Sequence, residues 1–270
     1  MQIELVQTGS REGNIKANLA LALQRIAQCA PATDIVVFSE TFLTGFAEPG
    51  HTADRALRLD GPEIAALAVA SAQQNVAIAI GLLEDDSGDI FNTTVFITPE
   101  AGLAFKYRKT HLWPDERSLV KAGDKLVCGL WRGKRIGLLI CYDIEFPETA
   151  RALAAMGCEL LVVTNGNMDP YGPVHRHAAL ARAFENQMFF AMTNRIGEGA
   201  GFIFAGESAA VDPYGNLLGA LQRGEGRLTV TLDFALIEQA RSQYHYLKDR
   251  RLMLPGHIET CSDGQRWWPL

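Results

Sequence analysis

The sequence of 270 residues has no long uninterrupted apolar run and no densely basic stretch. A membrane-spanning helix needs about twenty mostly apolar residues, so we expect no membrane span. Nucleic-acid-binding domains cluster Lys and Arg on one face. Here the net charge is −6, and basic residues occur only in short groups, such as DRR at 249–251, which opens with an acid. We therefore expect neither a membrane nor a nucleic acid as a partner.

Cysteine pairs are also missing. The five cysteines are odd in number and widely spaced, and no CxxC occurs, which argues against a disulfide framework and against structural zinc. The only close histidine pair is HRH at 175–177. On a helix those two rings diverge, so we expect surface or supporting histidines and no metal site. The first residues lack the basic and apolar regions of a signal peptide, which predicts a cytoplasmic protein.

Apolar runs and amphipathic segments alternate along most of the chain. This alternation predicts an α/β or α+β fold of layered sheets and helices. No linker rich in Gly, Pro or Ser divides it, so we expect one domain over residues 1–270. Strands are predicted over 3–7, 34–40, 76–84, 90–98, 135–141, 159–165, 189–195 and 226–234, and helices over 14–29, 61–75, 147–157 and 177–189.

The last residues depart from this pattern. From about residue 252 to 270 the chain contains PGHIETCSDGQRWWPL and no periodic apolar face. Trp267 and Trp268 would stand exposed unless they pack on something, because large apolar patches are rarely left open to water. We therefore expect a C-terminal arm over 252–270 that packs against another surface, such as a neighbouring subunit.

Residues able to do chemistry follow three predicted strands. Glu40 ends IVVFSE, Lys109 follows FKYR, and Cys141 ends RIGLLIC. Sheet-based enzymes build their sites at strand ends. A cysteine nucleophile needs a base for its proton and a donor for the oxyanion. Each residue also has an ordinary interpretation: a packed cysteine for Cys141, a loop acid for Glu40 and a solvated basic strand for Lys109.

Three sequence blocks decide between these interpretations. SETFLTGF, KYRKTHLWPDE and ICYDIEFPETAR begin at positions 39, 106 and 140. In this order they resemble the signature blocks of the nitrilase superfamily, the carbon–nitrogen hydrolases. GLLEDDSGDIFNTTVFI, ARAFENQ, TNRIG and GESAAVDPYGN extend the resemblance over roughly residues 1 to 250. It implies a four-layer α-β-β-α sandwich without metal or cofactor, and a homodimer or higher homo-oligomer formed along the helix after Cys141.

The resemblance also implies a role for each site residue. Cys141 would be the nucleophile and Glu40 the general base. Lys109 and the backbone N–H of Tyr142 would stabilise the tetrahedral intermediate. Glu116 would be the second glutamate beside the lysine. The implied reaction is hydrolysis of a small carboxamide to a carboxylic acid and ammonia through a thioester.

The sequence predicts the substrate less precisely than it predicts the catalytic residues. CYDIEFPE and the segment 165–173 are similar to amidases of short aliphatic amides, including amine-bearing ones such as 5-aminopentanamide. The turn-rich segment is placed to wall a pocket, so Asn165, Asn167 and Met168 are candidate substrate contacts. Glu145 is a candidate partner for a substrate ammonium. Its ordinary interpretation is an acid that bonds backbone groups in the turn.

Other functions stay open on the sequence. The superfamily also contains N-carbamoyl amine or amino acid amidohydrolases and nitrilases. A non-catalytic binding member and a glutaminase that supplies ammonia to a separate partner are alternatives of a different class. GLWRGKR at 129–135 is one residue short of a phosphate-binding loop and lacks its Ser or Thr.

Overall fold

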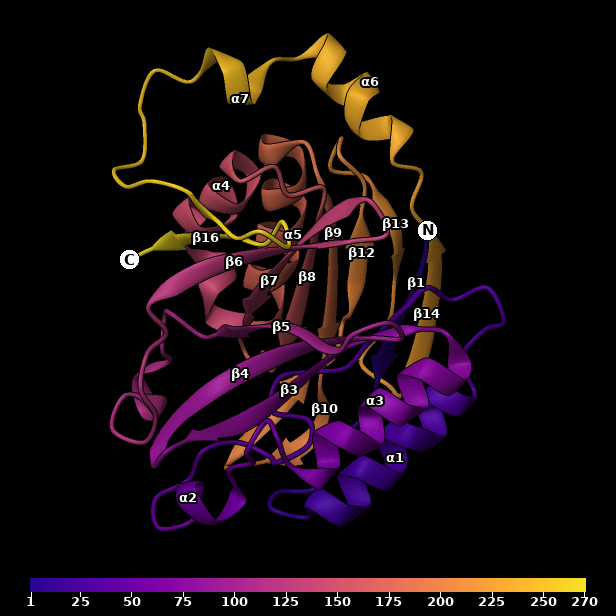
Figure 1. Cartoon of the computed structure of the whole chain (residues 1–270), viewed down its shortest axis with the longest axis vertical. Helices are drawn as coiled ribbons and strands as arrows, with labels where there is room; N and C mark the ends of the chain where they lie inside the picture. Colours follow the sequence, from indigo (N-terminus) through magenta and orange to yellow (C-terminus); the bar gives the residue numbers. More distant parts are fainter.

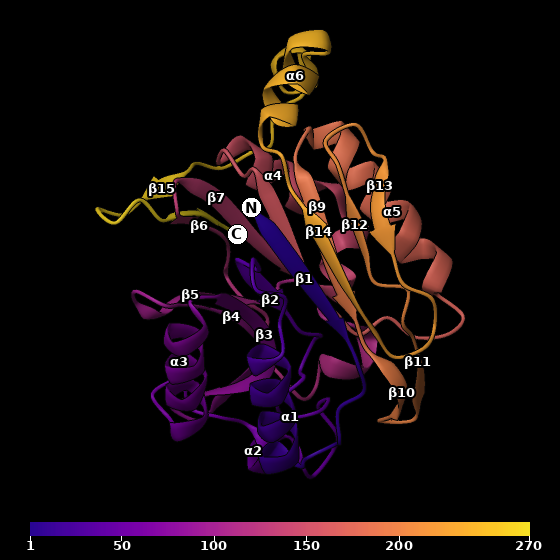
Figure 2. The same ribbon diagram turned by 90° about the vertical axis from the view of Figure 1, so that its right-hand side faces the viewer.

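A computed structural model describes residues 1–270, and it places two β-sheets back to back between two layers of helices (Figure 1). Helices α1 and α3 cover the outer face of the first sheet, and α4 and α5 cover that of the second (Figure 2). The predicted four-layer α-β-β-α sandwich is confirmed. The bounds of the helices are α1 (Ile15–Ala27), α2 (Thr52–Arg55), α3 (Pro62–Gln74), α4 (Pro147–Ala155), α5 (Gly172–Asn186), α6 (Ala235–Gln243) and α7 (Tyr246–Asp249).

The first sheet has six strands, of which β1, β2 and β3 run parallel. The second has eight, with β7, β8 and β9 parallel. The first contains, in spatial order, β14 (Gly226–Thr231), β1 (Gln2–Gln7), β2 (Ile35–Val37), β3 (Ala77–Asp86), β4 (Asp89–Thr98) and β5 (Gly102–Arg108). The second contains β13 (Leu217–Ala220), β12 (Ala209–Val211), β9 (Phe189–Asn194), β8 (Leu160–Asn165), β7 (Lys134–Ile140), β6 (Lys125–Trp131), β16 (Arg266–Pro269) and β15 (Glu259–Thr260). The strands β10 (Ile196–Gly199) and β11 (Phe202–Ala205) form a separate hairpin.

Burial on both faces explains the continuous apolar runs of the central strands. Ile35 and Val37 of β2 belong to the core between the sheets, while Val36 belongs to the core under α1 and α3. Successive side chains of a strand point to opposite faces, so a strand covered on both sides is apolar at every position. None of the helices has the length and apolar content that crossing a membrane requires.

Several predicted boundaries were wrong. The strand predicted over 34–40 ends at Val37, since the chain then turns and Gly81 N–H bonds the carbonyl of Ser39 at 3.2 Å. The helix predicted from 177 begins at Gly172, so it includes His175. A short 3₁₀ helix, η2 (Cys141–Glu145), separates β7 from α4. Residues 129–135 lie in the β6–β7 hairpin, whereas a phosphate-binding loop leads into a helix.

The C-terminal arm packs on its own chain. Strand β16 pairs antiparallel with the edge strand β6, with Trp267 opposite Val127 and Trp268 opposite Leu126. Both indoles are therefore partly buried against the core between the sheets. This pairing covers the edge of β6, which would otherwise offer unpaired backbone groups. The tryptophans do not require a neighbouring subunit.

Candidate active site

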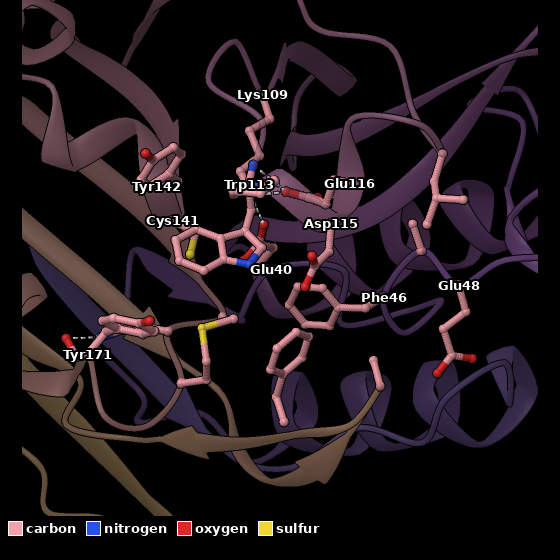
Figure 3. Close-up of a pocket in the computed structure, with 18 of the residues that line it drawn as sticks. Glu40, Phe46, Glu48, Lys109, Trp113, Asp115, Glu116, Cys141, Tyr142 and Tyr171 are labelled. Atoms are coloured by element: carbon pink, nitrogen blue, oxygen red, sulfur yellow. Dashed lines mark hydrogen bonds and ion pairs between the residues drawn. The ribbon is translucent and has the colours of Figure 1, made fainter.

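The two sheets place four of the predicted residues at one end of a single cavity of about 510 Å³ (Figure 3). Glu40 follows β2, Lys109 follows β5, Glu116 ends the 3₁₀ helix η1 (Pro114–Glu116), and Cys141 follows β7. All four side chains are buried, and all four line the cavity. Residues up to about a hundred positions apart in the sequence are brought together because the strands that precede Glu40, Lys109 and Cys141 end on the same side of the sandwich.

Lys109 is held between the two glutamates. Its Nζ lies 2.7 Å from Glu40 Oε1 and 2.6 Å from Glu116 Oε2. Burial disfavours the charged ammonium, but Glu116, Glu40 and Cys141 outweigh that cost and raise the pKa of Lys109 well above its ordinary value. The ammonium is therefore charged and oriented before any substrate arrives.

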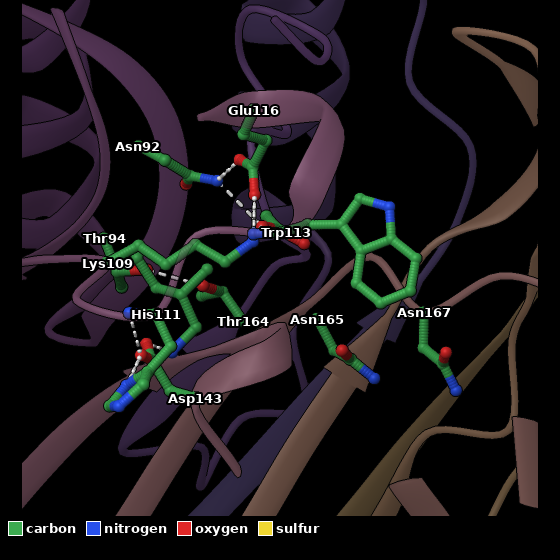
Figure 4. A network of polar contacts seen from close by, with 12 residues as sticks. Asn92, Thr94, Lys109, His111, Trp113, Glu116, Asp143, Thr164, Asn165 and Asn167 are labelled. Carbon is green, nitrogen blue, oxygen red and sulfur yellow. Dashed lines mark hydrogen bonds and ion pairs between the residues drawn. The ribbon is translucent and has the colours of Figure 1, made fainter. Parts of the chain in front are cut away.

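Asn92 joins the same network from β4 (Figure 4). Its side-chain Nδ2 donates to Glu40 Oε1 at 2.8 Å and to Glu116 Oε1 at 2.7 Å. The sequence analysis missed this residue. The only signal available was a polar amide inside the apolar strand IFNTTVF, and a buried amide must find partners.

One oxygen of Glu40 is left without a partner. Its Oε1 is bonded by Lys109 and Asn92, whereas the buried Oε2 accepts no hydrogen bond. Burial and the charge of Glu116 raise the pKa of Glu40 above its ordinary value, although Lys109 lowers it. A carboxylate with a raised pKa and a free oxygen is suited to accept a proton.

Cys141 stands at a sharp turn. Its φ is +46°, in the left-handed region that side chains other than glycine rarely adopt. The pKa of its thiol is raised well above the ordinary value by burial and by Glu40, while Lys109 and the Gly166 N–H, which hydrogen-bonds the sulfur, act to lower it. The resting residue is thus a thiol that needs a base, and the strained turn holds its sulfur at the cavity.

Asp143 holds the turn at Cys141 in place. Its carboxylate accepts hydrogen bonds from the Tyr107 hydroxyl at 2.9 Å, the His111 backbone N–H at 2.9 Å and the Ile140 N–H at 3.1 Å. The ring of His111 stacks on Phe146 with 4.1 Å between centroids. His111 therefore holds a loop, and Asp143 is a second residue that the sequence analysis missed.

The predicted substrate residues are divided between the cavity and the interior. Glu145, Asn167 and Met168 line the cavity, as does Tyr142. Asn165 does not: it is fully buried, and its side chain contacts His175 and Met192. The Glu145 carboxylate bonds the His175 ring at 3.1 Å, so the ordinary interpretation, in which it bonds backbone groups, is wrong.

Of the two positions expected for His175, surface or supporting, the surface one is wrong, since only 2% of the residue is exposed. No group of three or more His, Cys, Asp or Glu side chains that could hold a metal ion is found around it. Burial lowers the pKa of His175, although Glu145 opposes this change. The only signal for it in the sequence was the histidine pair HRH at 175–177.

Comparison with known families gives one match that covers most of the chain. A family model described as carbon-nitrogen hydrolase matches residues 2–242. The chain is 52% identical over 267 residues to an (R)-stereoselective amidase from a Pseudomonas species, covering 98% of this chain and 97% of that protein. It is 32% identical over 223 residues to an omega-amidase of Escherichia coli K12, covering 80% and 84%.

Solved structures agree with this match. A carbon–nitrogen hydrolase superfamily protein of Xanthomonas campestris, with an arsenic adduct in its active site, is 26% identical and superposes with a TM-score of 0.87 over 95% of this chain and 99% of that one. A mutant of the amidase from Nesterenkonia sp. AN1 is 27% identical, with a TM-score of 0.83 over 93% and 94%. That structure has the acetamide moiety of fluoroacetamide added covalently at the active-site cysteine.

Proposed function

The chain belongs to the carbon–nitrogen hydrolase family, and from this membership we propose that it hydrolyses a small carboxamide to a carboxylic acid and ammonia through a thioester on Cys141. It is a hydrolase of carbon–nitrogen bonds. The observation that most directly supports the cysteine mechanism is the unpaired, buried Oε2 of Glu40 in the cavity that Cys141 lines. That oxygen can take the thiol proton without breaking an existing hydrogen bond.

Acylation begins when Glu40 accepts the proton of Cys141. The sulfur attacks the amide carbon, a C–S bond forms, and negative charge collects on the carbonyl oxygen. The Lys109 ammonium and the Tyr142 backbone N–H stabilise this oxyanion, and one such donor is worth about 3–4 kcal/mol. Ammonia leaves as the C–N bond breaks, and its nitrogen takes the proton held by Glu40.

Deacylation repeats the exchange with water. Glu40, ionised again, removes a proton from a water molecule that attacks the thioester carbon. The C–S bond breaks, the carboxylic acid is released, and the proton returns to the sulfur. In this scheme Glu116 keeps Lys109 in place, since it occupies one of the ammonium donors at 2.6 Å.

The walls of the cavity support a small substrate with mixed character. Phe46, Met168 and Phe204 form an apolar cluster, of which Phe46 and Met168 line the cavity together with Asn167 and Glu145. We propose that these residues contact the part of the substrate beyond its amide group. Because one relative is an (R)-stereoselective amidase, we expect this chain to distinguish the enantiomers of a chiral carboxamide.

Two further properties are part of the proposal. We propose a cytoplasmic location, because all five cysteines are unpaired, as is typical of proteins in a reducing compartment. We also propose a homo-oligomer, supported by large apolar side chains exposed beside α4, the helix that follows Cys141.

Ammonia release from a substrate panel tests the function. The panel contains aliphatic amides, ω-amino amides, both enantiomers of an α-substituted amide, glutamine, ω-amides of keto acids, N-carbamoyl amino acids and nitriles. Each is assayed with the wild type and with Cys141→Ala. We expect release from carboxamides alone, and at least a 10³-fold loss in the mutant.

Other results would contradict the proposal. Release of ammonia and CO₂ from carbamoyl compounds would indicate the amidohydrolase alternative, and release from nitriles a nitrilase. Glutamine as the only substrate would indicate an ammonia-supplying glutaminase. No turnover, together with a thiol that resists alkylation, would indicate a non-catalytic member.

A further inference from the structure

The His175 ring lies in the wall of the cavity and joins two segments of the active site. It lies on α5, and its Nδ1 is 3.0 Å from Asn165 Oδ1, at the end of β8, while its Nε2 is 3.1 Å from Glu145 Oε1, in η2. Arg182, seven residues further along α5, donates from Nε to the carbonyl of Ile144 at 3.0 Å. Helix α5 therefore holds both the turn after the nucleophile and the end of the neighbouring strand.

The Asn165 contact leads directly to Gly166. Asn165 is tied on three sides: its carbonyl accepts the Glu40 N–H at 3.2 Å, its Nδ2 contacts Met192 Sδ at 3.1 Å, and its Oδ1 meets His175. Figure 4 shows its side chain beside the end of a strand. Because the peptide bond joins Asn165 to Gly166, the contacts that hold Asn165 also set the direction of the Gly166 backbone N–H.

Gly166 is packed against the catalytic groups. A Cβ at this position would lie 2.5 Å from Glu40 Oε2 and 2.3 Å from Phe46 Cζ, so any side chain there would displace the catalytic carboxylate and the Phe46 ring. Gly166 and Cys141 both line the cavity, and hydrogen bonding from the Gly166 backbone acts to lower the pKa of the Cys141 thiol. The glycine thus allows the main chain itself to approach the nucleophile.

We propose that His175 is a positioning residue of the hydrolysis: through Asn165 it aims the Gly166 backbone N–H at the Cys141 sulfur, where that N–H stabilises the thiolate. The proposal rests on Cys141 being the nucleophile, as proposed above. When Glu40 takes the thiol proton, the sulfur becomes negative and the N–H bond strengthens. It weakens when the sulfur is acylated and forms again when the thioester is hydrolysed.

The charges around the sulfur explain why such a donor matters. Glu40 after β2 and Glu116 in η1 disfavour a thiolate, and Lys109 after β5 favours it but is shared between those two carboxylates. Glu145 in η2 and His175 in α5 also line the cavity, and they contact each other. The Gly166 N–H is a neutral donor directed at the sulfur, and hydrogen bonds to an ionised group are the strong ones.

Two substitutions of His175 separate its two contacts. In H175N the new amide group lies near the position of Nδ1 and can still donate to Asn165, while the contact with Glu145 is lost. In H175Q the amide lies near the position of Nε2 and keeps Glu145, while the contact with Asn165 is lost. A residue that only filled space or held η2 would make the two variants behave alike or in the reverse order.

The readout is the acidity of the Cys141 thiol. The second-order rate of its alkylation by iodoacetamide is followed against pH by peptide mass spectrometry, together with kcat and KM for the best carboxamide. We expect H175Q to raise the apparent thiol pKa by about one unit, which is ten-fold in thiolate. It should also lower kcat about ten-fold, with KM changed less than two-fold. H175N should stay within about three-fold of the wild type in both rates.

Equal losses in both variants, or an unchanged H175Q, would overturn the proposal. Alkylation does not require turnover, so this result stays separate from a failure of the proposed function, which an inactive wild type would show in the substrate panel.

If H175Q does not fold, the proposal can still be tested by a measurement on the wild-type protein. Asn165–Gly166 is the only Asn-Gly pair in the sequence, so labelling with ¹³C-asparagine and ¹⁵N-glycine selects the Gly166 amide in an NMR spectrum. We expect its proton resonance to move downfield as Cys141 ionises and to lose this titration in Cys141→Ala. A Gly166 resonance indifferent to the thiol would refute the proposal.

Discussion

The two oxygens of Glu40 have different surroundings, and this difference assigns them different tasks. Oε1 is bonded by Lys109 and Asn92, which fix the carboxylate in place. Oε2 is buried and unpaired, a state that normally costs about 1–3 kcal/mol. Such a cost is tolerated where the group has a partner during the reaction, and here that partner is a proton.

The first prediction concerns the acid limb of the pH profile. Glu40 must be ionised to accept the thiol proton, so activity falls as the pH drops through its pKa. Because burial and Glu116 raise that pKa above the ordinary 4.5, we expect the limb of kcat/KM to have its midpoint above pH 4.5. E116Q removes one of the raising charges and should move the limb to lower pH. E40Q should lack the limb and lose about 10²–10⁴-fold in rate.

The assay is kcat/KM for one neutral carboxamide between pH 4 and 9. Full activity at pH 4.5 in the wild type would argue against Glu40 as the base. A limb that moves to higher pH in E116Q would show that Glu116 does not act on Glu40 through its charge.

A second prediction tests the role of Glu145 in substrate choice. Its carboxylate lines the cavity, and one of its oxygens bonds His175, so the other can meet a substrate ammonium. E145Q keeps the shape and a hydrogen bond to His175 but removes the charge. For ω-amino amides we expect KM to rise about ten-fold, with KM for neutral amides of equal length changed less than two-fold. An equal loss on both substrate types would contradict the pairing.

The backbone of strand β3 approaches the turn at Glu40 closely. Gly81 lies where β3 passes Glu40, and a Cβ there would lie 2.4 Å from the Thr41 nitrogen and 2.8 Å from Glu40 Cα. Both are backbone atoms that cannot turn aside. Gly81 N–H also bonds the carbonyl of Ser39 at 3.2 Å. The glycine therefore sets how closely the base approaches the nucleophile across the two sheets.

The third prediction follows from this contact. G81A should displace the Glu40 turn and lower kcat by roughly 10²-fold, the usual effect of a misplacement of about 1 Å. Overpacking should also lower the free energy of unfolding by about 1–3 kcal/mol. G224A is the matched control, because a Cβ there meets nothing within 4 Å. Kinetics and urea unfolding measure both effects, and wild-type kcat in G81A would contradict the argument.

How much the sequence could predict depends on whether a residue acts locally. Glu40, Lys109 and Cys141 follow apolar runs, and strand ends are visible in a sequence. Asn92, Asp143 and His175 act mainly through partners 10 to 52 positions away in the sequence, and spacing alone cannot pair them. Whether the pKa of Glu40 is raised or lowered depends on burial, which is a property of the whole fold. The pairing of β16 with β6 could not be predicted either, because it joins segments that are far apart in the sequence.

Two large apolar side chains are exposed to solvent beside α4. Figure 1 shows α6, α7 and the segment after them standing away from the two sheets. In this segment Leu252 is 91% and Met253 72% exposed, and together with Arg151 of α4 they line a shallow groove. Exposed apolar patches of this kind mark interaction sites. Since the family resemblance implies pairing along α4, a second copy of the chain is the partner we expect.

The fourth prediction is therefore about mass in solution. One chain weighs 29.5 kDa, and we expect light scattering after gel filtration to give at least twice that value for the wild type. The double substitution L252D/M253D places charges that resist burial, and it should reduce the mass to that of one chain. V69D is the control, because Val69 is 56% exposed on α3, which covers the opposite face of the sandwich. A monomeric wild type would contradict the homo-oligomer, and an unchanged mass in L252D/M253D would exclude this surface as the interface.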